Sequence, residues 1–151
     1  MSRSRVIVGL SGGVDSSAAA FLLKKRGYDV IGVTMVTQEM SSSSEESICS
    51  AEEAVKDAKR VAEAIGIPHH IIDFKEIFRE KVMDYFADEY LHARTPNPCI
   101  VCNRYVKWEA LLNAGEKMGA DMIATGHYAR IIKLPNGRYA VSNAASASKD
   151  Q

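Results

Sequence analysis

Residues 5–17 read RVIVGLSGGVDSS, and this stretch decides the fold that the sequence predicts. Residues 5–10 are a short run rich in β-branched side chains, which is typical of a buried strand. The run stops at Gly12 and Gly13, where the backbone can turn sharply because no Cβ is in the way. Apolar residues then recur at helical spacing over residues 15–26. We therefore expect a strand, a tight glycine loop and a helix, in that order.

The same alternation of strand and helix continues along the chain. Further strands are expected over residues 28–36, 69–74 and 121–125, helices over 50–65, 77–90 and 103–118, and a hairpin over 129–142 around Pro135-Asn136-Gly137. Strands that alternate with helices predict parallel βαβ units with right-handed crossovers. The expected fold is α/β, with a Rossmann-like parallel sheet, helices on both faces and a C-terminal β-hairpin. Ligands of such sheets bind at the carboxyl ends of the strands.

Two connecting segments are expected to be loops. Residues 38–47 are polar, acidic and rich in serine, and Ser50 with Glu53 forms a capping box that is expected to start the next helix. Residues 92–103 read HARTPNPCIVCN, and two prolines separated by one residue argue against a helix interior or a central strand. We expect an ordered loop here, with Asn103 as the N-cap of the helix that follows.

The composition excludes several classes of protein. The chain has 151 residues, of which 25% are charged and 46% hydrophobic, as in one soluble globular domain. Nineteen basic residues balance nineteen acidic ones, so nucleic-acid binding would depend on a local patch. No apolar run approaches the roughly 20 residues of a membrane helix, and the N-terminus has no secretion signal. Three cysteines without such a signal favour a reducing compartment. We expect a cytoplasmic protein that does not bind membranes.

The glycine loop is a candidate anion-binding site. Its backbone N–H groups, the hydroxyls of Ser11, Ser16 and Ser17, and the free helix N-terminus can converge on a phosphate. Asp15 alone would repel a phosphate, so its presence predicts a Mg²⁺ ion between them. The loop is not a Walker loop, and its spacing is not that of G-x-G-x-x-G. GLSGG also matches the nucleophile elbow of serine hydrolases with Ser11 as nucleophile, and a simple capped helix after a glycine turn is a further alternative.

The proline-cysteine segment is the second candidate site. Its prolines stiffen the backbone and hold Asn97, Cys99 and Cys102 in place. With Asn103 as N-cap, Cys102 would lie at a helix N-terminus, where the helix dipole favours the thiolate. Two cysteines at this spacing can also share a metal ion or an iron–sulfur cluster, or form a redox pair. A zinc site would need ligands from Cys49 or the four histidines, and two inert, packed cysteines are a further alternative.

Three other side chains are candidates for a place in the site or in the core. Lys107 can contact a phosphate or lie on a solvated helix face. Trp108 is predicted to be part of the core. His127 follows Gly126 at the end of a strand, so it is expected to face the cleft, although a single histidine is more often structural.

These motifs resemble those of a known family. SGGVDSS resembles the PP-loop of ATP pyrophosphatases, which cleave between the α- and β-phosphates and form adenylated intermediates. With GLSGGVDSS, Met35, ICSAEEAVKDAKRVAEAIGIPHHIIDF, TPNPCxxCN, ATGHYAR and KDQ, the chain resembles the N-terminal part of tRNA-specific 2-thiouridylases, which place sulfur on C2 of a wobble uridine. The resemblance implies a PP-loop nucleotide-binding catalytic domain over residues 1–133. Residues 134–151 would then be the hairpin and the start of a downstream region.

The resemblance also implies the site residues. ATP, with Mg²⁺, is expected to bind at Gly9, Leu10, Ser11, Gly12, Gly13, Val14, Asp15, Ser16, Met35 and Gly126. The tRNA is expected to contact Asn97, Pro98, Cys99, His127, Ser148, Lys149 and Asp150. Catalysis is expected to involve Cys102, Cys99 and Asp15.

The implied reaction starts when the uridine O2 attacks the α-phosphorus and pyrophosphate leaves. A persulfide on a later cysteine, whose outer sulfur is transferred from a sulfur donor protein, then delivers sulfur while AMP departs. Sulfide is the alternative sulfur source. Many members carry Asp where this chain has Cys99, and the chain is similar to a subset in which Cys99, Cys102 and a later cysteine hold an iron–sulfur cluster. The family is more than twice as long as this chain. An incomplete ATP- and tRNA-binding fragment, or a different PP-loop adenylating enzyme, is therefore an alternative.

Overall fold

Four strands form a parallel sheet in a computed structural model that describes residues 3–37 and 45–146, with side chains in the second range from residue 52 onward. The order in the sheet is β3-β2-β1-β4. The strands are β1 (Arg5–Gly9), β2 (Asp29–Val36), β3 (His69–Asp73) and β4 (Met122–Ala124). Val6 of the central strand pairs with Val30 on one side and Met122 on the other. The predicted parallel α/β architecture is confirmed.

Alternate residues of β1 face opposite sides of the sheet, and both faces are covered. Val6 and Val8 pack with Ala58 and Ala62 of a helix on one face. Ile7 packs against Leu111 on the other face. A strand that is buried on both faces is apolar at consecutive positions. This is why the run RVIVGL indicates a buried strand.

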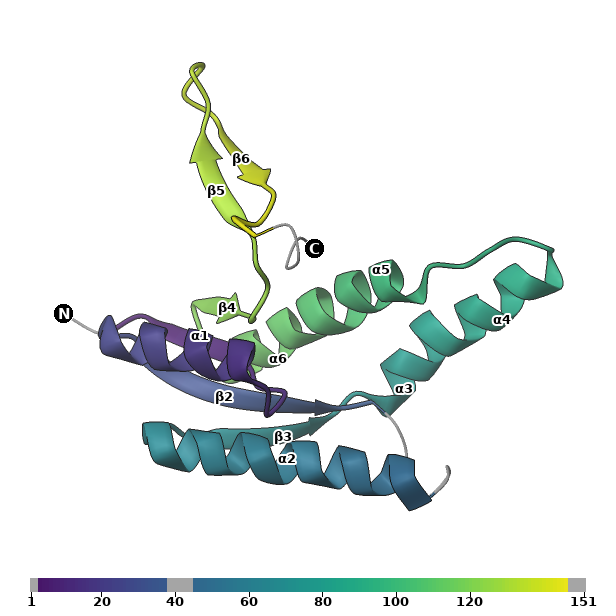
Figure 1. Ribbon diagram of the computed structural model, residues 1–151, viewed down its shortest axis with the longest axis horizontal. Helices are drawn as coiled ribbons and strands as arrows, with labels where there is room; N and C mark the ends of the chain where they lie inside the picture. Colours follow the sequence, from purple (N-terminus) through teal and green to yellow (C-terminus); the bar gives the residue numbers. More distant parts are fainter. Residues whose placement is uncertain (1–2, 38–44, 147–151) are drawn as a thin grey trace.

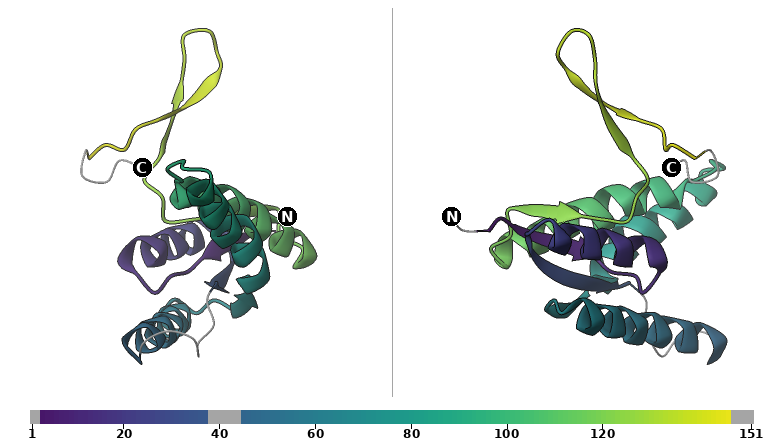
Figure 2. Two further views of the ribbon diagram at one scale, coloured as in Figure 1. Left: turned by 90° about the vertical axis from the view of Figure 1, so that its right-hand side faces the viewer. Right: turned by 60° about the vertical axis from the view of Figure 1, so that its left-hand side comes forward.

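The helices are divided between the two faces by the order of the strands. From β1 to β3 the chain moves across the sheet in one direction, so right-handed crossovers place α1 (Val14–Lys25) and α2 (Glu45–Ile65) on the same face. After β3 the chain returns past β1 to β4, and the intervening helices cover the opposite face. Figures 1 and 2 show these two layers. The position where the chain reverses lies between β1 and β4.

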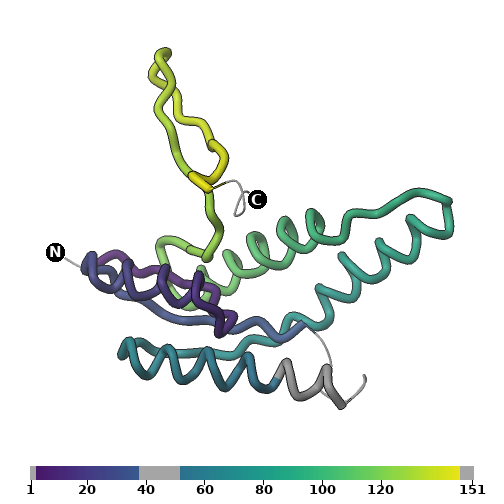
Figure 3. The backbone as a smooth tube through the Cα atoms, viewed as in Figure 1, coloured from purple at the N-terminus to yellow at the C-terminus, as the bar shows by residue number. Residues whose placement is uncertain are grey.

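The helices after β3 form two long rods that run side by side and in opposite directions (Figure 3). The rods comprise α3 (Lys75–Phe78), η1 (Arg79–Met83) and α4 (Asp84–Leu91), then α5 (Pro98–Cys102), η2 (Asn103–Ala110) and α6 (Leu111–Lys117). Phe74, Val82, Val106 and Ala110 are buried between the rods and the sheet. The segments η1 and η2 are π-helical, a wide form of helix that is rare and often found at functional sites.

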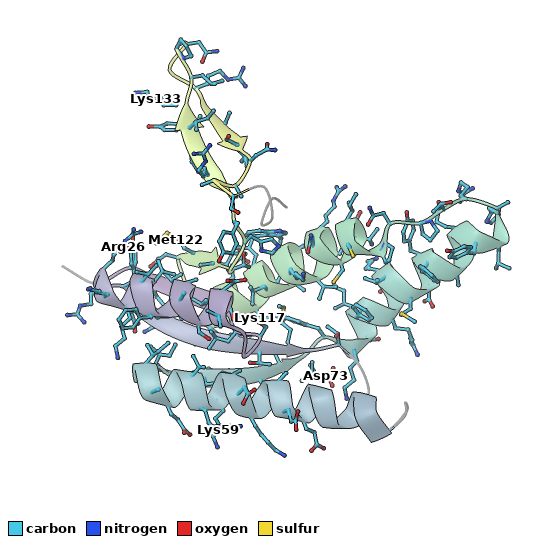
Figure 4. The ribbon with its side chains drawn as sticks, in the orientation of Figure 1. Arg26, Lys59, Asp73, Lys117, Met122 and Lys133 are labelled. Atoms are coloured by element: carbon cyan, nitrogen blue, oxygen red, sulfur yellow. The ribbon has the colours of Figure 1, made fainter. Side chains whose placement is uncertain are left out.

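The predicted hairpin is also confirmed. It comprises β5 (Arg130–Lys133) and β6 (Tyr139–Ser142), and Ile131 pairs with Val141. It stands away from the sheet in Figures 1 and 2, and Figure 4 shows Lys133 on it, far from Asp73 at the end of β3.

The start of the second helix differs from the prediction. The helix α2 begins at Glu45, so residues 45–47 are helical and Ser50 lies inside the helix rather than at its N-cap. The predicted capping box is therefore wrong. Residues 38–44 of the predicted loop lie outside the described residues. Acidic residues are favourable in a first helical turn, which is consistent with a start at Glu45.

The structure also differs from the prediction in the proline-cysteine segment, residues 92–103. The structure begins a helix at Pro98, and the N-cap is Asn97, whose Oδ1 accepts a hydrogen bond from the Ile100 N–H at 3.3 Å. The prolines had predicted a loop through residue 103. However, proline is well tolerated in the first helical turn, where its missing N–H would have no partner within the helix. Asn103 therefore lies within a continuous helix and is not an N-cap.

No helix within residues 3–37 and 45–146 is both long enough and apolar enough to cross a bilayer.

Candidate functional site

A cleft of about 410 Å³ opens at the carboxyl ends of β1, β2 and β4. Three segments supply its walls, namely the glycine loop after β1, residues 34–37 at the end of β2, and residues 125–127 after β4. Ala54 and Val55 of α2 and Lys107 of η2 complete the lining. The cleft includes the point between β1 and β4 where the strand order reverses, which is where ligands of open α/β sheets bind.

The cleft brings together seven of the ten residues that were predicted to bind ATP. Of the predicted tRNA contacts, it includes His127. Its lining includes Gly9, Leu10, Ser11, Asp15, Ser16, Met35, Gly126 and His127. It does not include Gly12, Gly13, Val14, Asn97, Pro98, Cys99 or Cys102. Ser148, Lys149 and Asp150 lie outside the described residues.

The glycine loop is organised around the buried hydroxyl of Ser16. Ser16 Oγ accepts a hydrogen bond from the Ser11 N–H at 3.2 Å and donates to the Gly13 carbonyl at 3.2 Å. Ser17 Oγ donates to the same carbonyl at 2.7 Å. The Ser11 amide is therefore satisfied inside the loop, whereas the sequence predicted that successive amides would converge on an anion. The Ser16 hydroxyl thus takes up this one amide, and the convergence of the other loop amides on an anion stays a prediction.

Two glycines allow backbone to approach backbone around the loop. Gly12 has a φ of +79°, and a Cβ at this position would lie 2.8 Å from the Ala54 carbonyl oxygen in α2. A Cβ on Gly126 would lie 2.7 Å from the Ser16 nitrogen and 2.8 Å from the Asp15 carbonyl carbon. Real Cβ atoms do not come so close to backbone atoms. Gly12 thus sets the loop against α2, and Gly126 sets the segment after β4 against the start of α1.

Asp15 connects the same two walls through its side chain. Its Oδ1 accepts a hydrogen bond from the Tyr128 hydroxyl at 2.7 Å. Asp15 lies in the first turn of α1, where a carboxylate is favourable, and it lines the cleft. A carboxylate beside serine hydroxyls is a donor set that suits Mg²⁺, which usually binds one or two carboxylates together with substrate phosphates. The residues present therefore fit a nucleotide-bound magnesium ion.

His127 faces the cleft, as predicted, and is held on two sides. Its Nδ1 lies 2.7 Å from Thr125 Oγ1, and its ring centroid lies 5.7 Å from that of Trp108. Burial, together with the positive charge of Lys107, lowers the pKa of His127, which favours the neutral imidazole. Trp108 is 42% exposed, and the prediction that it belongs to the core is wrong. The wide turn of η2 places it beside the cleft instead.

Sequence reasoning missed the threonines of the cleft. Thr34, Thr37 and Thr125 each follow or end a strand, and all three line the cleft. The buried Thr34 hydroxyl donates to the Leu10 carbonyl at 2.9 Å and lies 2.8 Å from His69 Nε2. A polar residue at the carboxyl end of an otherwise apolar strand was the signal that could have identified them.

Cys102 lies in a different environment from the one predicted. It is part of a continuous helix, at the end of α5, and it packs against the buried cluster that contains Phe74 and Val82. Burial raises the pKa of its thiol, and nearby Lys107 only partly opposes this shift. The expected helix N-terminus that would favour the thiolate is absent because the helix begins four residues earlier, at Pro98. Cys99 is exposed.

We expect the two thiols to react at different rates. At pH 7.5, iodoacetamide should modify Cys102 more slowly than Cys99, because Cys102 is half-buried and its raised pKa lowers the thiolate fraction. The difference should narrow as the pH rises and should vanish in denaturant. Peptide mass spectrometry over a time course measures both rates. Faster modification of Cys102 in the folded chain would contradict this assignment.

The described residues do not contain a complete site for an iron–sulfur cluster. Among them, no group of three or more Cys, His, Asp or Glu side chains is placed to hold a metal ion. Cys99 and Cys102 supply two thiols, whereas a cluster commonly takes four ligands.

The sequence model of a family described as "tRNA methyl transferase HUP domain" matches residues 4–151. The chain belongs to this family. It is 57% identical over 150 residues to the tRNA-specific 2-thiouridylase MnmA of Lachnoclostridium phytofermentans, a match that covers 97% of this chain. The chain spans only about 42% of the length of that relative.

Two solved structures resemble this member of the tRNA methyl transferase HUP domain family. A 4-thiouridine synthetase in complex with RNA and bound ATP is 25% identical, with a TM-score of 0.58 over 82% of this chain and 29% of the other. A predicted subunit of tRNA methyltransferase from Methanocaldococcus jannaschii is 23% identical, with a TM-score of 0.56 over 97% of this chain and 60% of the other. The second likeness supports the fold alone.

The geometry does not support the serine hydrolase alternative. The Ser11 hydroxyl lies 3.2 Å from Ser16 Oγ and accepts a hydrogen bond from the Gly13 N–H at 3.4 Å. The histidine of the cleft, His127, is instead hydrogen-bonded to Thr125. A nucleophilic serine needs a base within hydrogen-bond reach.

Proposed function

We propose that this chain is the ATP-binding, base-activating part of an enzyme that converts a tRNA uridine to 2-thiouridine. The observation that carries the proposal is the cleft at the reversal of strand order, which gathers seven of the ten predicted ATP-binding residues. The 57% identity to a 2-thiouridylase supports thiolation over the methyl transfer that the family description mentions. The ATP-bound 4-thiouridine synthetase of similar fold supports the use of ATP.

In this proposal the phosphates of ATP lie on the glycine loop between Gly9 and Ser16, and the adenosine lies near Met35 and Gly126. Gly12, Gly13 and Val14 shape this loop without lining the cleft. Mg²⁺ would be held by Asp15 together with phosphate oxygens, and it would offset the charge repulsion between them. Lys107 reaches the same cleft from the opposite face of the sheet and adds a positive charge for the phosphates.

The proposed chemistry is an adenylation followed by sulfur transfer. The uridine O2 attacks the α-phosphorus, the bond to the β-phosphate oxygen breaks, and pyrophosphate leaves. The terminal sulfur of a persulfide then bonds to C2 and AMP leaves, which joins the base to the carrier cysteine through a disulfide. A thiolate attacks the carrier sulfur of that disulfide, so that a new protein disulfide forms and the thiolated base is released. Cys102 is the candidate for this thiolate, and Cys99 is a candidate contact to the base.

The tRNA contacts, the sulfur source and the limits of the domain are also proposed. Asn97, Pro98, His127 and residues 148–150 are proposed tRNA contacts, and a donor protein or sulfide is the proposed sulfur source. The division of the chain at residues 133 and 134, the cytoplasmic location and the iron–sulfur alternative stay predictions. A cluster would need ligands in addition to Cys99 and Cys102, and the iron content of anaerobically purified protein tests for it.

The proposal is tested by measuring binding and chemistry separately. Isothermal titration should detect binding of Mg·ATP, and Lys107→Met should weaken it about tenfold or more, because a hydrogen bond to a charged group contributes about 1.5–3 kcal/mol. Lys117→Met is the matched control, since Lys117 ends α6 and does not line the cleft. Equal effects of the two variants would contradict the placement of the phosphates.

Chemistry is measured as tRNA-dependent release of pyrophosphate and as formation of 2-thiouridine. The second candidate function is an ATP- and tRNA-binding fragment without activity, which is favoured by the 42% coverage of the longer relatives. Binding of ATP without pyrophosphate release would support that alternative and exclude adenylation by this chain alone.

A further inference from the structure

An aromatic pair lies at the rim of the cleft, and its tryptophan has no role in the function proposed above. Trp108 belongs to η2, and His127 follows β4. Their ring centroids are 5.7 Å apart, with an angle of 37° between the ring planes. Lys107 and His127 line the cleft, whereas Trp108 does not, so the indole lies just outside the nucleotide cleft. An exposed fraction of 42% for the largest apolar side chain of the molecule is unusual beside such a cleft.

The pair is fixed rather than loosely placed. The hydrogen bond between Thr125 and His127 Nδ1 holds the imidazole, and burial beside Lys107 lowers its pKa, which favours the neutral form. The helix that carries the indole is anchored, because Val106 and Ala110 of η2 are both buried in the core. A rigid aromatic surface of this kind loses little conformational freedom when a ligand stacks on it.

The location of the pair indicates which ligand it could receive. The glycine loop and the ends of β1 and β2 line the nucleotide cleft, while Trp108 lies on the helix that also carries Cys99 and Cys102. A second ligand that extended from the cleft along this helix would contact the indole. Unpaired RNA bases are typically held by stacking on aromatic side chains, and such stacking is tolerant of sequence.

We propose that Trp108, supported by His127, is the surface on which an unpaired RNA base stacks as it enters the cleft. This inference rests on the proposed function and deepens it by naming the residue that receives the acceptor base. Trp108 acts as a positioning residue that orients the base toward the nucleotide, and it takes no part in bond making or breaking.

The chain contains a single tryptophan, so its intrinsic fluorescence reports on this position alone. The full chain is titrated with a single-stranded oligouridylate and, separately, with Mg·ATP. Anisotropy of a labelled copy of the same RNA measures binding independently of the indole. We expect the RNA to quench Trp108 fluorescence over the same concentration range in which it binds. ATP alone should leave most of the fluorescence unchanged.

Substitutions separate stacking from a structural role. Trp108→Leu should weaken RNA binding about five- to hundredfold, and Trp108→Phe should recover most of the affinity because the aromatic face is kept. Both variants should bind Mg·ATP as the parent chain does. Phe86→Leu is the matched control, because Phe86 is a similarly exposed aromatic residue that pairs with Tyr90 at a centroid distance of 4.9 Å, on α4.

The outcomes are distinguishable. RNA binding without a change in fluorescence, or an unchanged affinity in Trp108→Leu, overturns the inference and leaves the proposed function intact. Quenching by ATP alone to the same extent as by RNA would assign the indole to the nucleotide and also overturns the inference. If the chain binds ATP but no RNA, this inference and the tRNA part of the proposed function both fail.

Discussion

Replacing Asp15 with alanine is expected to lower the affinity for Mg·ATP by about 100-fold or more, which corresponds to about 2.8 kcal/mol. Asp15 is the carboxylate of the glycine loop that lines the cleft, and without it the proposed magnesium ion loses its protein ligand. Isothermal titration at fixed Mg²⁺ measures the change. The same titration without Mg²⁺ should show a much smaller difference between the parent chain and the variant.

The same carboxylate also accepts the hydrogen bond from Tyr128, so a control must separate the two roles. Tyr128→Phe removes the hydroxyl and leaves Asp15 in place. We expect this variant to lose stability by about 0.5–1.5 kcal/mol, the usual contribution of one hydrogen bond, and to keep most of its affinity for Mg·ATP. If Asp15→Ala binds Mg·ATP like the parent chain, the loop is not a magnesium–phosphate site.

Replacing Gly126 with alanine is expected to destabilise the fold by about 2–3 kcal/mol and to weaken ATP binding in the molecules that remain folded. The added Cβ would meet the Ser16 nitrogen and the Asp15 carbonyl carbon at 2.7 and 2.8 Å, and both are backbone atoms that cannot rotate away. The segment after β4 must therefore move away from α1, which opens the cleft between them. Urea denaturation followed by circular dichroism measures the loss of stability.

Gly9→Ala is the matched control, since Gly9 also lines the cleft. Its Cβ would meet no atom nearer than the Leu111 Cδ2 at 3.6 Å, an ordinary contact distance. We expect its free energy of unfolding to stay close to that of the parent chain. Equal destabilisation by the two substitutions would show that the close approach at Gly126 is not what limits the packing of the cleft.

Much of the fold could be predicted because its signals are local. The run RVIVGL is apolar on both faces, and this pattern fixes β1 as a central strand. The turn residues Pro135, Asn136 and Gly137 likewise fix the hairpin. The order β3-β2-β1-β4 comes from the structure, and right-handed crossovers then decide which face each helix covers. The one reversal in this order places the cleft.

The site was harder to predict because its details depend on contacts between distant residues. Nothing local to Asp15 indicates that Tyr128 will donate to it, and nothing local to Trp108 indicates that His127 will keep it at the surface. The start of the helix at Pro98 was missed for a different reason. A proline can either end a helix or stand in its first turn. Here Pro98 stands in the first turn, because the Asn97 side chain caps the helix by accepting the Ile100 N–H.

The hydrogen bonds among Ser11, Gly13 and Ser16 have a consequence for how a ligand meets the glycine loop. These bonds join groups of the loop to one another, so folding itself fixes the loop and the conformational entropy of the loop is lost on folding. A nucleotide then binds to a preorganised bend and does not have to freeze a disordered one, which favours tighter binding for the same contacts. Affinity for the nucleotide should therefore depend on the serine hydroxyls even where they never touch it.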